Sequence, residues 1–71
     1  MKVYFVCNKA DVIVRQIAPA YSLEQLYANM AEYACGEPLP SLYAQSVVAE
    51  HMLRKEKYSI IDRDIVTDAR R

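Results

Sequence analysis

The 71-residue sequence has few of the residues on which recognisable catalytic and ligand-binding motifs depend. It contains one glycine, one histidine and two cysteines, and it has no tryptophan. A single glycine excludes a glycine-rich phosphate-binding loop, because such loops need several residues that let the backbone approach the phosphate closely. Two cysteines and one histidine do not supply the four ligands of a structural zinc site. We therefore expect neither a cofactor nor a metal site.

The few reactive side chains lack partners that would activate them. Cys7 and Cys35 lie far apart in apolar surroundings, and buried free thiols are favoured over a disulfide. A nucleophilic Cys7 would need a nearby cation or helix N-terminus to lower the pKa of its thiol, and only Lys9 is near in sequence. His51, the single histidine, has no nucleophile or metal ligand beside it. The sequence therefore predicts a protein that is not an enzyme.

Long apolar runs are also missing. No segment approaches the roughly 18 apolar residues needed to span a bilayer. Five apolar residues separate Lys2 from Asn8, fewer than the roughly seven to 15 of a signal peptide. We therefore expect a cytoplasmic protein that does not enter membranes. Nine basic and nine acidic side chains cancel, which argues against strong electrostatic attraction to nucleic acid.

Apolar side chains, in contrast, are abundant. They make up 54% of the chain, above the roughly 45–50% that is typical of globular proteins. A chain of this length forms one domain with a modest core. We expect residues 1–71 to fold as a single compact domain, with residues 68–71 as a frayed tail. Some of the apolar surface would then be covered in a homodimer or by a partner protein.

The clearest local pattern is a helix between Ser22 and Gly36. Ser22 and Gln25 have the spacing of a capping box, and Gly36 suits the left-handed residue that ends a helix. Between these caps, apolar residues recur every three or four positions, which places them on one helical face. The residues on this predicted face are Leu23, Leu26, Tyr27, Met30 and Ala34.

A second helix is predicted from Pro40 or Ser41 to Lys57. Its first half is apolar around most of its circumference, which indicates that it is covered on more than one side. We expect Leu53 to be buried between the two helices. Because the connection over residues 36–40 is short, the two helices should form an antiparallel αα-hairpin.

Both ends of the chain contain strand patterns with alternatives. Lys2–Cys7 and residues 12–17 are rich in β-branched residues, and the polar residues 8–11 between them favour a β-hairpin. The alternative for residues 9–17 is a short helix capped by Asn8. Residues 58–61 form either a third strand, with a turn at 62–64 and a short piece at 65–67, or the start of a helix. The expected fold is thus a small α+β domain in the order ββααβ. The alternative is a mostly α-helical protein with one N-terminal strand.

The six tyrosines fit two roles. Those at the edges of the helical faces are favoured as the half-buried rim of the core. The alternative is recognition of another protein, because exposed tyrosines are enriched at interfaces. We expect a patch of Tyr33, Leu39 and Tyr43 around the rigid connection between the helices. The alternative is that Leu39 folds back to cap the helix pair. If the surface lies elsewhere, the outer side of the second helix around Val47 and His51 is expected. The leading hypothesis is a non-enzymatic regulator or inhibitor that docks on a partner protein, with a homodimer as one form of this binding.

A nucleic-acid-associated regulator is the alternative function. Basic residues gather in the last third of the sequence, where acidic residues are mixed among them. Such mixed charge is more typical of a solvated surface than of a phosphate-binding site. The candidates for this alternative site are Arg54, Lys55, Lys57 and Arg63.

Overall fold

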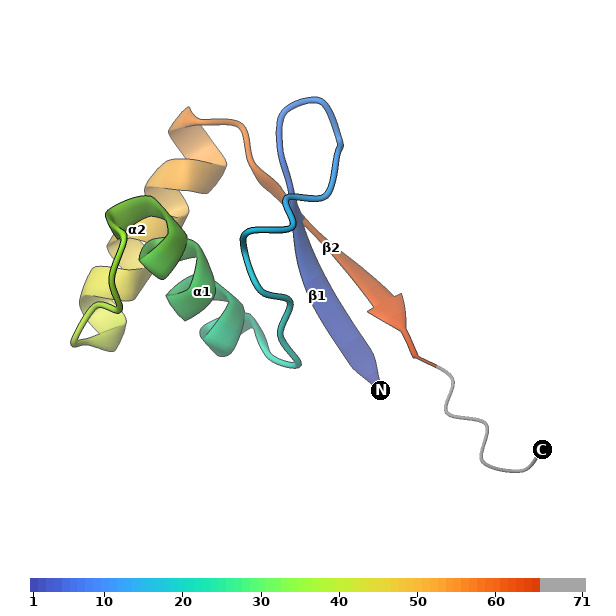
Figure 1. Ribbon diagram of the computed structural model, residues 1–71, viewed down its shortest axis with the longest axis horizontal. Coiled ribbons are helices and arrows are strands. Elements are labelled where there is room, and N and C mark those ends of the chain that lie inside the picture. The colour runs from blue at the N-terminus through green and yellow to red at the C-terminus, as the bar shows by residue number, and fades with distance from the viewer. Residues whose placement is uncertain (66–71) are drawn as a thin grey trace.

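The protein is a small α+β domain in which two helices pack beside a two-stranded antiparallel sheet (Figure 1). The computed structural model describes residues 1–65, so the predicted tail at 68–71 and most of the piece at 65–67 lie outside the described residues. The helices and strands, in chain order, are β1 (Lys2–Cys7), α1 (Leu23–Cys35), α2 (Leu42–Lys55) and β2 (Ser59–Asp64).

Strand β1 is bonded along both edges. On one edge it pairs antiparallel with β2, so that Phe5 lies opposite Ile61. On the other edge the Tyr4 N–H donates to the carbonyl of Ala20 at 2.8 Å, and the Ala20 N–H donates back at 3.1 Å. A second bridge joins Cys7 to Ile13 on this edge. The segment over residues 8–20, which we call the return segment, therefore covers the edge of β1 that β2 leaves open.

The return segment corrects the predicted extent of the N-terminal hairpin. The turn forms as expected, because the Asn8 side-chain oxygen accepts the N–H groups of Ala10 and Val12. The predicted strand over residues 12–17 is reduced to the isolated bridge at Ile13, and the helical alternative is not observed there. The chain turns away after this bridge because Ile17, only 2% exposed, inserts its side chain into the core.

Strand β2 confirms the C-terminal strand that was predicted over residues 58–61, and it continues to Asp64. The predicted turn at residues 62–64 is wrong, as is the helical alternative, because these residues continue the ladder with β1. Asp62 pairs opposite Tyr4, and the Asp62 carboxylate lies 3.4 Å from the Lys2 ammonium on the neighbouring strand. Cross-strand pairing thus outweighs the local turn preference of the two aspartates.

Both helices begin and end where local capping allows. The Ser22 hydroxyl accepts the Gln25 N–H at 3.1 Å, and the Gly36 N–H donates to the carbonyl of Glu32 at 2.8 Å. In α2 the N-cap is Ser41. This helix ends at Lys55, two residues before the predicted end, because Lys57 has a left-handed φ of 65°.

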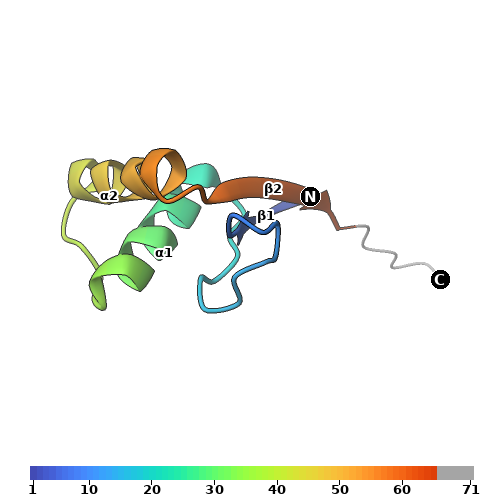
Figure 2. The same cartoon turned by 90° about the horizontal axis from the view of Figure 1, so that it is seen from above.

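The core lies where α1 contacts both α2 and β1. Figures 1 and 2 show that the two helices cross obliquely beside the sheet. Met30 of α1 is fully buried, as are Ala31 and, on α2, Ala49. Leu53 is only partly buried, and its neighbour Met52 occupies the core instead. The buried face of α2 is therefore rotated by about one residue from the predicted one.

Candidate functional site

The outer face of α2 carries an exposed stripe that no other described element covers. Tyr43, Val47 and His51 follow one another at intervals of four residues, so they lie on one side of the helix. Tyr43 is 80% exposed and Val47 is 50% exposed. The buried residues Ala49 and Met52 fix the other side of the helix against the core. We call Tyr43, Val47 and His51 the α2 outer stripe.

Charged side chains of both signs border the α2 outer stripe. The Arg54 guanidinium lies 4.0 Å from the Glu50 carboxylate, one helical turn away. His51 Nδ1 lies 3.8 Å from the Glu56 carboxylate, a contact that is ionic only when the imidazole is protonated. Such exposed pairs contribute little to stability. An apolar centre with a polar, solvated border is nevertheless the usual anatomy of a protein–protein interface.

The structure does not assemble the predicted patch of Tyr33, Leu39 and Tyr43. Tyr33, 42% exposed, lies against Tyr58, which follows the C-terminal end of α2, whereas Tyr43 is in the first turn. Partial burial raises the pKa of the Tyr58 phenol above its usual value, and the charge and hydrogen bond of Tyr33 and the charge of Glu56 raise it further. Leu39 is partly buried. Of the predicted binding residues, only Tyr43, Val47 and His51 share one face.

The basic residues of the alternative site lie in two places. Arg54 and Lys55 are in the last turn of α2, and Lys57 follows closely. Arg63 pairs opposite Val3 on β2, four residues beyond Ser59 and thus about 13 Å further along the strand. Arg63 therefore lies apart from the other three. Nucleic-acid binding by this set stays an untested prediction that the arrangement does not favour.

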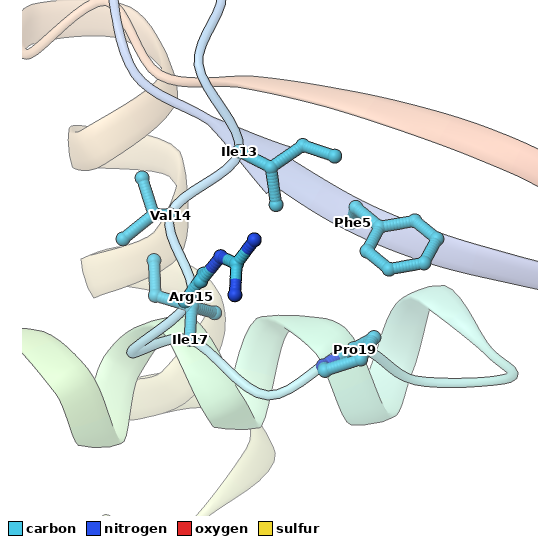
Figure 3. Close-up of a pocket in the computed structure, with 6 residues that line it drawn as sticks. All are labelled: Phe5, Ile13, Val14, Arg15, Ile17 and Pro19. Carbon is cyan, nitrogen blue, oxygen red and sulfur yellow. The ribbon is translucent and has the colours of Figure 1, made fainter.

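A hollow beside β1 was not predicted from the sequence. It has a volume of about 320 Å³ and lies between β1 and the return segment (Figure 3). It forms because residues 15–19 bulge away from β1 between the bridges at Ile13 and Ala20. A straight strand over residues 12–17 would have closed this space. Two features of the sequence could have indicated this bulge. The polar pair Arg15–Gln16 interrupts the β-branched run, and Pro19, which cannot donate a backbone hydrogen bond, follows it. The lining residues are Phe5, Ile13, Val14, Arg15, Ile17 and Pro19.

Reactive groups are scattered over the described part of the chain. Cys7 is a buried free thiol as predicted, whereas the prediction of a buried thiol is wrong for Cys35, which is exposed. Within residues 1–65, no three histidine, cysteine or acidic side chains gather closely enough to hold a metal ion. None of the helices in this range has the length and apolarity needed to cross a membrane. No protein-family model, curated protein or solved structure matches the chain at a significant level.

Proposed function

We propose that the chain is a non-enzymatic protein-binding module, a small regulator or inhibitor that acts by docking the α2 outer stripe on a partner protein. The observation that carries this proposal is the exposed run of Tyr43, Val47 and His51 on a helix whose opposite side is held in the core. Tyrosine offers a large apolar ring with a polar tip, and it is one of the three side chains enriched at the energetic centre of interfaces.

The setting of the stripe favours binding. Because Ala49 and Met52 are packed in the core, α2 presents the stripe in one fixed orientation. A preorganised surface loses less conformational entropy when a partner docks than a flexible one does. The bordering Glu50 and Arg54 have opposite signs, so a second copy of the chain would not meet a field of one sign. We therefore take self-association as the first form of docking to test.

The test is analytical ultracentrifugation of the parent and two double variants at micromolar concentrations. Tyr43→Ser with Val47→Ser removes the apolar part of the stripe, and both residues are exposed enough for the fold to survive. Tyr21→Ser with Val12→Ser is the matched control, because these residues are also exposed, at 68% and 58%, but lie outside α2. We expect the parent and the control to associate and the stripe variant to sediment as a monomer.

If the parent is a monomer, the same three proteins serve as baits for partners in a lysate of the native host. A partner retained by the parent and the control but lost by the stripe variant supports the proposal. Association or capture that is equal for all three proteins contradicts it, because the α2 outer stripe is then not the docking surface. Circular dichroism of the three proteins checks that the variants keep their helices.

A further inference from the structure

The hollow beside β1 has apolar walls and one cationic group. Phe5 comes from β1, and Ile13, Ile17 and Pro19 come from the return segment (Figure 3). Its volume of about 320 Å³ lies at the small end of the roughly 300–1,000 Å³ range of small-molecule sites. Arg15 is the one charged residue among the described residues that line it. These walls suit a ligand no larger than one ring or a short chain.

The walls of the hollow are fixed by hydrogen bonds at both ends of the bulge. At one end the Val14 N–H donates to the carbonyl of Val6 at 2.8 Å. At the other end the Tyr4 and Ala20 backbones exchange two hydrogen bonds. Between these points the Asn29 amide of α1 donates to the carbonyl of Ala18 at 2.9 Å. The backbone that carries the apolar walls is therefore already formed, which reduces the entropy lost on binding, whereas the exposed Arg15 side chain becomes ordered when the ligand binds.

Arg15 is the group that gives the hollow its chemical preference. Figure 3 shows its guanidinium directed into the space bounded by Ile13, Phe5 and Pro19. Within residues 1–65, the ion pairs involve other cations, and no carboxylate lies within 4.0 Å of Arg15. Arginine is charged at all physiological pH values, and its planar fork matches a carboxylate with two parallel hydrogen bonds.

We propose that the hollow binds a small organic monocarboxylate that carries one apolar ring or chain. The Arg15 guanidinium donates to both carboxylate oxygens, and the apolar part lies against Phe5 and Pro19. Both halves of the ligand are needed. An inorganic anion leaves the apolar walls in water, and a neutral apolar molecule leaves the guanidinium without an acceptor. This site is independent of the α2 outer stripe and does not rest on the function proposed for it.

The test is an NMR titration of the ¹⁵N-labelled chain with 3-phenylpropionate, and with 3-phenylpropionamide as the neutral match. Saturable shift changes are expected at the backbone N–H groups of Phe5 and of residues 13–18, and 3-phenylpropionamide should bind about tenfold more weakly or worse. Arg15→Gln should weaken the carboxylate by a similar factor, because hydrogen bonds to charged groups are the stronger ones. Arg54→Gln, which removes an exposed arginine beside Glu50, is the matched control and should leave binding unchanged.

The proposal is overturned if the parent shows no saturable, localised shifts up to roughly 20 mM carboxylate, above the dissociation constant expected for so small a probe. Equal binding of the acid and the amide also overturns it, as does equal binding by Arg15→Gln. If Arg15→Gln does not fold, Arg15→Lys replaces it. Lysine keeps the charge without the planar fork, so an intermediate affinity supports the site and an unchanged affinity contradicts bidentate recognition.

Discussion

At the scale of single residues, Gly36 ends α1 in a conformation that penalises every other amino acid. Its φ is +81°, and a Cβ added there would meet no atom within 4 Å, so a substitution is opposed by backbone strain alone. Gly36→Ala should therefore lower the free energy of unfolding by about 1 kcal/mol in urea denaturation.

Lys57 provides the opposite control for this experiment. It has a left-handed φ of 65° although it is not glycine. Lys57→Gly relieves this strain but adds freedom to the unfolded chain, so its stability should equal or slightly exceed that of the parent. If Gly36→Ala is as stable as the parent, the left-handed end of α1 is not maintained in solution.

Met52 and Leu53 are neighbours whose burial distinguishes two rotations of α2. Met52 is 2% exposed, whereas Leu53 is only partly buried at the edge of the core. Met52→Ala should lower the free energy of unfolding by about 2–5 kcal/mol, as large-to-small core substitutions do. Leu53→Ala should lower it by less, and thermal melts of the two variants measure the order. The reverse order would show that the helix is rotated toward the face predicted from the sequence.

At the scale of elements, the two edges of β2 differ in hydrogen bonding. Tyr4 directs its N–H and C=O toward Ala20, so the alternation of an antiparallel pair directs those of Val3 and Phe5 toward β2. On β2 the residues opposite them, Arg63 and Ile61, bond to β1. The backbone groups of Ile60, Asp62 and Asp64 therefore face the outer edge, where no strand among residues 1–65 pairs with them.

Amide hydrogen exchange measures this alternation directly. We expect the amides of Ile61 and Arg63 to exchange at least about tenfold more slowly than those of Ile60 and Asp62, because only the first pair is bonded to β1. A smooth gradient along β2 would contradict the pairing register. Charged residues on an open strand edge also discourage pairing with another chain, and Asp62 and Asp64 occupy this one.

Elements whose limits depend on local chemistry could be predicted from the sequence, and those that depend on distant pairing could not. Ser22, Gly36 and Ser41 cap the helices with neighbours three or four residues away, and each is visible in the sequence. The length of β2 depends on Lys2 and Val3, about 60 residues earlier in the chain. No local pattern shows that Asp62 will continue a strand rather than turn.

The candidate surfaces also differ in whether they depend on local sequence or on contacts between distant segments. Tyr43, Val47 and His51 form a stripe because of helical spacing alone, so their common face could be predicted. Tyr33 was expected beside Tyr43 because antiparallel helices would bring them to one end. The oblique crossing of the helices places Tyr33 beside Tyr58 instead. The hollow at Arg15 depends on two bridges to β1 and on the burial of Ile17, which are tertiary features.

At the scale of the whole molecule, one small core joins the helices to the sheet. Val6 of β1, Leu26 of α1 and Met52 of α2 all belong to it and are at most 2% exposed. Stability of roughly 0.05–0.15 kcal/mol per residue gives a chain of this length only about 4–11 kcal/mol. A single truncation in this core therefore removes a large share of the stability of both halves together, and partial folding of one half alone is not expected.

Because the two thiols differ in exposure, their reaction rates can measure how often the helices and the sheet unfold together. Cys35 is open to solvent in the native state, whereas Cys7 is closed off in a strand that is bonded on both edges. A thiol reagent added under native conditions reaches Cys35 at once and Cys7 only when the sheet opens. The ratio of the two modification rates therefore gives the population of the open molecule without denaturant and without an introduced label.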